Sequence, residues 1–177
     1  MRWAEIKERQ PRLAALGQKR LIEPGVALIA TIRRDGTPRL SPVEPFIMDG
    51  GLLLSMLWGS RKAADLIRDP RTLVHSIVTS RDGGAGEFKL RGSARAEESP
   101  DMQQRYADSV AASLGWRPTP GRFHLFRIDI DDVVFIRYDD ATGAPYVAGW
   151  PPGREFVRRG TSATSVGPAE PRHDLIV

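Results

Sequence analysis

Residues 52–69 have the sequence L-L-L-S-M-L-W-G-S-R-K-A-A-D-L-I-R-D, which predicts an apolar strand followed by a helix that begins near residue 60. The first turn of this helix contains Arg61 and Lys62, although the partial positive charge of a helix N-terminus favours acidic residues there. Local departures of this kind often mark functional positions. Unpaired backbone N–H groups, the Ser60 hydroxyl and two cations together predict a phosphate site. The alternative is that both cations are ordinary solvated surface residues.

The residues before this stretch predict an antiparallel meander. Strands are expected at about 26–34, 38–48 and 52–58, because these stretches are apolar and rich in β-branched residues. Asp35-Gly36 and Asp49-Gly50-Gly51 are typical turn sequences between them. An earlier helix is expected at 11–23, with Pro11 in the first helical position.

The residues after the helix continue the β pattern. A fourth strand is expected at 72–79, and residues 87–97 alternate strictly between charged and apolar side chains, as in a half-exposed strand. The charged face of this strand is either solvated or part of an interface. A helix is expected from Ser99 to Leu114, and a final hairpin is predicted at 123–130 and 133–138 around Asp131-Asp132.

These elements predict a mainly β fold with six or seven mostly antiparallel strands and inserted helices. A sheet of that size avoids exposed edges most easily by closing, so we expect a small β-barrel. Residues 1–140 would form a single domain with an N-terminal helix. Residues 141–177, rich in Gly and Pro, are expected to form an irregular C-terminal tail packed on that domain.

The amino-acid composition of the chain excludes several classes of functional site. The 177 residues carry a net charge of +4 with no cysteine, which excludes disulfides, thiolate metal sites and cysteine nucleophiles. The basic residues are scattered, so small anionic ligands are favoured over nucleic acid. No apolar run is long enough to span a bilayer and no secretory signal is visible, so a cytoplasmic location is expected. The histidine spacing suggests no metal site, and no acyl-hydrolase motif is present.

The meander and the G-S-R-K helix start resemble the flavin-binding split-barrel family related to pyridoxamine 5′-phosphate oxidase. The resemblance covers about residues 20–138: A-T-I-R-R-D-G-T-P-R-L-S-P-V, then L-L-L-S-M-L-W-G-S-R-K-A-A-D-L, then D-P-R before the fourth strand. It implies an antiparallel split barrel of the FMN-binding type, and a homodimer with the cofactor between subunits.

The resemblance also implies the cofactor-binding residues, position by position. The family's phosphate-binding cations fall on Arg61 and Lys62, next to Ser60. The strand that contacts the flavin through its backbone falls on Ser55 and Met56. The strand beside the flavin ring system falls on Leu40, Ser41, Pro42 and Val43. A polar residue on a later strand falls near Glu87, where the family often has an amide.

The function implied is a flavin-dependent oxidoreductase that transfers a hydride at flavin N5 to or from an unknown small molecule. The oxidase's own substrate motifs, Y-x-x-x-R-x-x-x-S and R-x-H, are absent, which argues against vitamin B6 oxidation. The alternatives are a reductase of the same fold that uses the 8-hydroxy-5-deazaflavin coenzyme, and a non-enzymatic flavin-binding protein. No catalytic side chain and no metal ligand are predicted, because the flavin supplies the chemistry.

One further hypothesis concerns the stretch from Tyr146 to Arg159. It contains several large apolar side chains, which are expected to pack on the protein rather than remain in water. We expect this stretch either to help form the substrate pocket or to pack against the barrel away from the cofactor.

Overall fold

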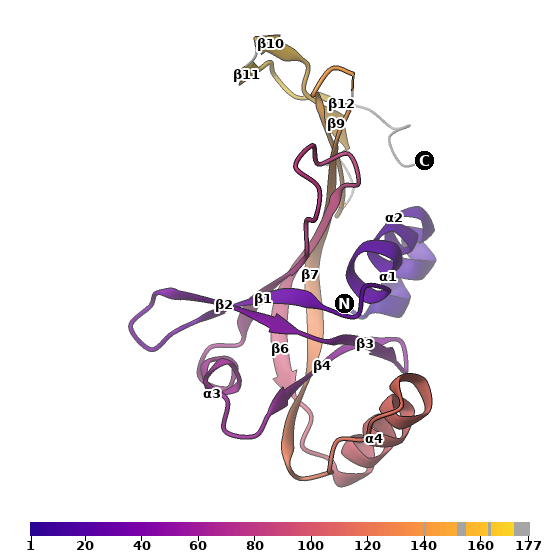
Figure 1. Cartoon of the computed structure of the whole chain (residues 1–177), viewed down its shortest axis with the longest axis vertical. Helices are drawn as coiled ribbons and strands as arrows, with labels where there is room; N and C mark the ends of the chain where they lie inside the picture. The colour runs from indigo at the N-terminus through magenta and orange to yellow at the C-terminus, as the bar shows by residue number, and fades with distance from the viewer. Residues whose placement is uncertain (140, 152–154, 163, 172–177) are drawn as a thin grey trace.

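A computed structural model describes residues 1–139, 141–151, 155–162 and 164–171 of the chain. It is an antiparallel split barrel with helices at its periphery, as predicted (Figure 1). The helices are α1 (Trp3–Arg9), α2 (Pro11–Gly17), the π-helical turn η1 (Gln18–Ile22), α3 (Arg61–Arg68) and α4 (Pro100–Leu114). The strands of the barrel are β1 (Ala27–Ile32), β2 (Pro38–Val43), β3 (Pro45–Met48), β4 (Gly51–Leu57), β5 (Arg71–Ser76), β6 (Glu87–Ala96) and β7 (Phe123–Tyr138).

The barrel is split between β2 and β4. Pairing runs from β2 through β1, β5, β6 and β7 to β4 and β3. The predicted single strand 38–48 is interrupted at Glu44: β2 pairs with β1, and β3 pairs instead with β4. Pro42 and Pro45 flank the break and cannot donate backbone hydrogen bonds, so the ladder does not continue through this point. The sheet therefore stays open beside Glu44.

The predicted hairpin around Asp131-Asp132 is wrong. Residues 123–138 form one 16-residue strand, β7, whose first half pairs with β4 and whose second half pairs with the later strand β8 (Pro145–Trp150). Arg91 of β6 faces Asp132 and the next residue, Gly92, faces Ile130, so Asp131 is the extra residue of a bulge on β7. The Asp132 carboxylate forms an ion pair with Arg91 at 2.5 Å. Pairing with β6 on either side of the bulge thus keeps this part of the chain in one extended strand.

The C-terminal segment is not the irregular tail that we expected. Its described residues form β8, β9 (Phe156–Val157), β10 (Gly160–Ser162), β11 (Ser165–Val166) and β12 (Glu170–Pro171). Strands β8, β9 and β12 extend the sheet from the second half of β7 as an arm that projects from the barrel (Figure 1). The apolar side chains of the stretch do pack there, since Val157 is buried and Trp150 lies against the core.

The helices α1 and α2 with η1 cover one side of the sheet, where the expected helix 11–23 is divided between α2 and η1. Trp3, Ile6, Leu13 and Leu21 are buried against the barrel strands. Gly17 allows this contact, because a Cβ there would lie 2.5 Å from Trp3 and 2.7 Å from Phe88. No helix in the described part of the chain is long and apolar enough to cross a membrane.

Helix α3 is anchored by a buried carboxylate. Asp65 is 5 % exposed and accepts hydrogen bonds from Thr31 on β1 at 3.0 Å and from Arg39 on β2 at 2.6 Å. Burial raises the pKa of Asp65, but the hydrogen bonds from Arg39 and Thr31 and the charge of Arg39 outweigh it, so the pKa lies below its usual value. The helix that contains Arg61 and Lys62 is thereby fixed to two strands.

Asp65→Asn should lower the free energy of unfolding by about 3 kcal/mol, because it leaves the Arg39 guanidinium without its buried partner. Since the folded-state pKa of Asp65 is lowered, its contribution is present above the unfolded pKa and is lost as the pH falls through the folded value. Asp69→Asn, just after the C-terminal end of the same helix, removes the ion pair with the exposed Arg71 and should cost less than about 1 kcal/mol, since Asn can still accept from the Arg71 backbone N–H. Urea unfolding of both variants would test this; equal losses would contradict it.

Candidate functional site

A groove of about 520 Å³ lies at the split in the barrel, a volume suited to a small-molecule ligand. Three separate elements that the sequence singled out meet there: the end of β2, the end of β4 and the first turn of α3. The residues that line the groove are Val26, Pro42, Val43, Glu44, Ser55, Met56, Leu57, Lys62, Trp116, Pro118, Thr119, Arg122 and Phe123. Five of the nine predicted cofactor residues are therefore brought together.

Lys62 is the cation of the groove. Its amine donates to the backbone carbonyl of Pro42, which bridges α3 to β2. Burial lowers the pKa of Lys62, and the nearby Glu44 carboxylate opposes that shift. The half-buried ammonium group is therefore poorly solvated and would gain from an anionic ligand.

Ser60 lies at the N-cap of α3, but its hydroxyl does not cap the helix. The hydroxyl oxygen is buried and has no hydrogen-bond partner within the described part of the chain. Buried polar atoms are nearly always paired, so an unpaired one at a helix N-terminus is an open position for a ligand oxygen. A phosphate group fits this set of donors: the hydroxyl, the first-turn N–H groups and the Lys62 ammonium.

Ser55 is held from behind the groove by Tyr106 of α4. The Tyr106 ring is 1 % exposed and packs edge-on against Phe46, with ring centroids 5.6 Å apart. Burial raises the pKa of Tyr106, while a hydrogen bond with the Ser55 side chain lowers it, and the net pKa lies above its usual value. The buried phenol therefore stays protonated and fixes Ser55 at the groove wall.

The loop after α4 also lines the groove, and the sequence analysis missed it. Trp116 is 43 % exposed, and with Arg122 it places an aromatic ring and a cation at the same groove. Gly115, which ends α4 at a φ of 74°, directs the chain into this loop. In the sequence, a tryptophan and an arginine follow the glycine that ends α4, but these residues match no functional motif.

The remaining predicted residues, Leu40, Ser41, Ser60 and Arg61, lie outside the lining of this groove. Arg61 faces a second depression, with Arg33, Arg34 and Arg39. Ser41 is half-buried on β2 opposite Ile29, and the neighbouring Leu40 is 63 % exposed.

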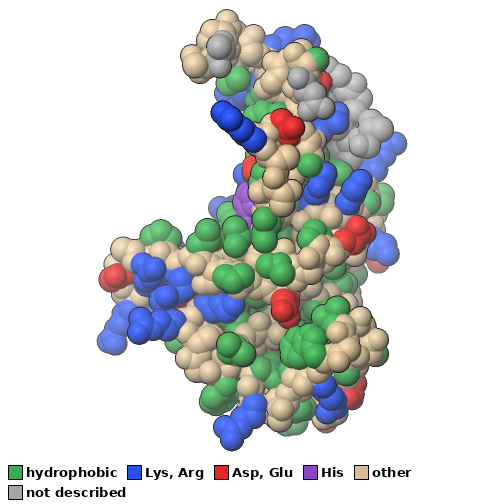
Figure 2. All heavy atoms as spheres, viewed as in Figure 1, with side chains coloured by type: hydrophobic (Ala, Val, Ile, Leu, Met, Phe, Trp, Pro, Cys, Tyr) green, Lys and Arg blue, Asp and Glu red, His purple; other side chains and the backbone are tan. Residues whose placement is uncertain are grey.

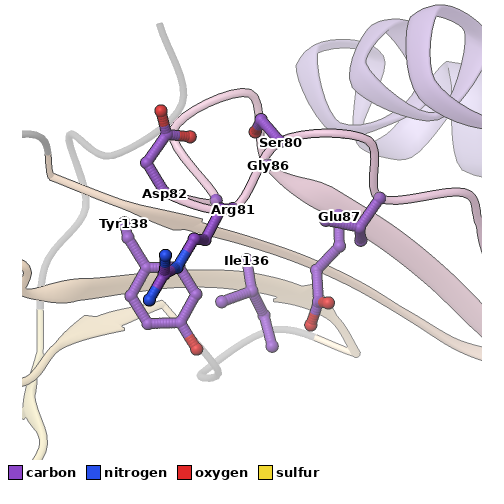
Figure 3. Close-up of a pocket in the computed structure, with 9 residues that line it drawn as sticks. Ser80, Arg81, Asp82, Gly86, Glu87, Ile136 and Tyr138 are labelled. Atoms are coloured by element: carbon purple, nitrogen blue, oxygen red, sulfur yellow. The ribbon is translucent and has the colours of Figure 1, made fainter.

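Glu87, the later-strand position, lies in a different hollow of about 340 Å³ at the base of the arm. Figure 3 shows this hollow between the loop that contains Ser80 and Asp82 and strand β7, with Glu87 at the end away from Tyr138. The predicted later-strand contact is thus not part of the groove within one chain.

Trp58 belongs to a third depression, on the other side of Phe123 from the groove. Its ring is 60 % exposed and stacks flat on His124, with centroids 4.7 Å apart and an angle of 6°. His124 Nε2 accepts a hydrogen bond from the Gly59 N–H at 3.2 Å. The stack thereby supports the backbone just before Ser60.

The stretch from Tyr146 to Arg159 lies in the arm, remote from α3 (Figure 1). None of its described residues lines the groove. Within one chain, the described part of this stretch therefore packs away from the groove. Residues 152–154 lie outside the described residues.

A family model described as pyridoxamine 5′-phosphate oxidase matches residues 16–137. This match begins at the end of α2 and spans η1, the barrel strands β1–β6, the helices α3 and α4 and nearly all of β7. No curated protein matches the chain.

Solved structures share the fold at low sequence identity. A putative pyridoxamine 5′-phosphate oxidase from Listeria innocua is 15 % identical, with a TM-score of 0.57, covering 70 % of this chain and 94 % of that one. The conserved hypothetical protein Rv2991 from Mycobacterium tuberculosis is 22 % identical, with a TM-score of 0.52 over 61 % and 74 % of the two chains. A heme binding protein from Mycobacterium smegmatis is 20 % identical, with a TM-score of 0.54 over 76 % and 57 %.

Tyr106→Phe should lower the free energy of unfolding by about 1 kcal/mol, because it removes one buried hydrogen bond while it keeps the packing of the ring. Tyr138→Phe is the matched control: this ring is 43 % exposed on the arm, and the change should stay within about 0.5 kcal/mol. Chemical denaturation of the two variants gives both values. The assigned role of Tyr106 is wrong if the two losses are the same.

Proposed function

The chain belongs to the pyridoxamine 5′-phosphate oxidase family, and from that premise we propose that it is a homodimeric, FMN-dependent oxidoreductase acting on a small molecule. The observation that supports this most is the convergence of Pro42 and Val43, Ser55 and Met56, and Lys62 on one groove. These residues were selected from three separate stretches of sequence. Their meeting at one place is what a cofactor site requires.

Lys62, the Ser60 hydroxyl and the N-terminal turn of α3 would hold the cofactor phosphate. The backbone of Ser55 and Met56 would lie along the flavin ring system. When bound, the flavin supplies hydride transfer at N5. The protein would then bind and orient the flavin and exclude water from it. Trp116 and Phe123 provide apolar surface that would exclude water from the groove.

The homodimer is supported by the apolar surface around the groove. Leu57, Trp58 and Ile67 are 82 %, 60 % and 62 % exposed, and they lie close together at the end of β4 and on α3. Large apolar side chains gathered at one face mark interaction sites. A second copy that covers this face would also close the open side of the groove.

The identity of the cofactor is tested by the absorbance spectrum and mass of whatever copurifies with the protein. FMN would support the proposal, and an 8-hydroxy-5-deazaflavin would support the deazaflavin alternative. A Soret band would instead indicate heme, which a structural neighbour is named as binding. Reduction of a bound flavin by a nicotinamide, followed by reoxidation with an acceptor, separates an enzyme from a non-enzymatic flavin-binding protein.

Lys62→Ala should weaken FMN binding by about ten-fold or more, since a charge-assisted hydrogen bond to phosphate is worth roughly 1.5–3 kcal/mol. Lys19→Ala removes an exposed lysine from η1, on the opposite side of the barrel, and should leave the affinity unchanged. Fluorescence titration of apo protein measures both. Unchanged affinity in Lys62→Ala would exclude the groove as the phosphate site.

FMN affinity should also fall as the pH rises through the lowered pKa of Lys62, because the ammonium charge exists only below that pKa. Lys62→Arg keeps the charge at alkaline pH and should remove this decline. The measurement is the same titration, repeated across the alkaline range. An identical pH profile in wild type and Lys62→Arg would contradict the role of the amine.

Sedimentation at micromolar concentration should give twice the chain mass of 19.6 kDa. Ile67→Glu places a charge on the apolar face and should shift the protein toward monomer. A cofactor-loaded wild-type monomer would contradict the dimer.

A further inference from the structure

The loop between α4 and β7, residues 115–122, brings an unpaired cation to the groove. Arg122 lines the groove, and its guanidinium has no hydrogen-bond or ion-pair partner among the residues that the structure describes. Trp116, on the same loop, lines the groove as well and is 43 % exposed. The cofactor contacts proposed above use no charge from this loop, so the guanidinium is available to another ligand.

This loop is held against α4 at two points. Arg117 forms an ion pair with Asp108 of α4. The Gly121 N–H donates to the Gln103 side chain, also on α4, at 2.8 Å. Between these two contacts Pro118 is buried, and its ring fixes the backbone φ. A loop braced in this way presents its remaining side chains to a ligand at little further entropic cost.

Among the described residues that line the groove, the two cations lie on opposite sides of the end of β4. Lys62 is held on the β2 side, where its amine donates to the Pro42 carbonyl. Arg122 is on the β7 side, because it directly precedes Phe123, which pairs with Leu57 of β4. Neighbouring strands lie about 4.8 Å apart, so the β2 and β7 sides of β4 are separated by about 10 Å. A phosphate held beside Lys62 therefore leaves Arg122 for a different group.

The charges around the groove favour a single carboxylate as that group. Glu44 lies near Lys62 and raises its pKa, which leaves the charge of Arg122 without a counterpart in the groove. One guanidinium matches one carboxylate, since the two groups pair through two parallel hydrogen bonds. Figure 2 shows Lys and Arg side chains gathered over the β1–β2 hairpin, away from α4 (Figure 1), and multiply charged anions would be attracted there instead.

We propose that Arg122 and Trp116 form the substrate side of the groove and select a planar organic carboxylate, an aromatic or conjugated acid. The inference rests on the proposed flavin-dependent function, whose substrate class it specifies. Arg122 pairs with the carboxylate, and the Trp116 ring packs on the flat apolar body of the acid. A neutral analogue leaves the guanidinium without a partner, so the same contact discriminates against it.

The test is calorimetric titration of the purified protein with benzoate and with its neutral analogue benzamide, at constant ionic strength. The wild type should bind benzoate about ten-fold or more tightly than benzamide. Arg122→Ala should remove this preference, and Trp116→Ala should weaken the binding of both compounds. If Arg122→Ala fails to fold by circular dichroism, Arg122→Gln replaces it.

Arg105→Ala is the matched control. It removes the same charge from the exposed side of α4, where Arg105 pairs with Asp49 outside the groove, and should leave both affinities unchanged. Equal losses of benzoate affinity in Arg105→Ala and Arg122→Ala would show a general effect of net charge and would overturn the proposal. Phenyl phosphate that binds more tightly than benzoate, and only when Arg122 is present, would overturn the carboxylate class.

Titration with and without FMN separates this inference from the proposed function. If benzoate preference depends on Arg122 but the protein binds no FMN, the carboxylate site stands and the flavin proposal fails. If FMN binds but the wild type shows no preference for benzoate, or keeps it in Arg122→Ala, the carboxylate site is overturned alone. Displacement of benzoate by FMN would place Arg122 in the cofactor site and would also overturn the inference.

Discussion

The buried carboxylate of Asp65 is the contact on which the candidate site depends. It joins α3 to β1 through Thr31 and to β2 through Arg39, so one side chain fixes the helix relative to two strands. The first turn of that helix then supplies Lys62 to the groove and Arg61 to the depression beside the β1–β2 hairpin. A network of this kind is weak evidence for stability, but it specifies one geometry, because any shift of the helix leaves a buried charge unpaired.

The groove exists because the barrel fails to close. At Glu44 the chain leaves its pairing with β1 and turns to pair with β4, so neither strand covers the space between them. Lys62 spans this opening by donating to Pro42, and Glu44 supplies the opposing charge. The two prolines that prevent a continuous ladder are therefore the covalent reason for a cavity at this point. Leu57 at the end of β4 lines this opening and is 82 % exposed, and the exposed Trp58 follows it in the chain, which is why cofactor binding and association of two copies are proposed at neighbouring surfaces.

Periodicity and turn chemistry predicted the barrel strands and the helices α3 and α4, because each of these elements buries one face against its neighbours. These sequence patterns failed where residues distant in the sequence determine the local structure. Asp131-Asp132 has turn composition, yet pairing with β6 on both sides of Asp131 keeps the strand extended, and Arg91 forms an ion pair with Asp132. The tail has loop composition, yet residues 145–150 pair as β8 along the edge of β7 that β4 does not cover. For the site, Lys62 and Ser55, which the sequence singled out, line one groove, whereas Trp116 and Arg122 reach it because of where α4 ends in space, which no local sequence pattern contains.

The cations at the start of α3 remain the clearest local conflict in the chain. Each one opposes the helix dipole by about 0.3–1 kcal/mol, and neither acts as a cap. Asp65 does not offset this cost, because its carboxylate is already used by Arg39 and Thr31. The unpaired Ser60 hydroxyl adds a second unfavourable feature to the same turn. An anion bound on either side of the turn would offset both the unfavourable charge of the cations and the unpaired hydroxyl, since one charge-assisted hydrogen bond contributes about 1.5–3 kcal/mol. The turn is therefore better suited to the bound protein than to the free one, as expected of a site arranged for its ligand.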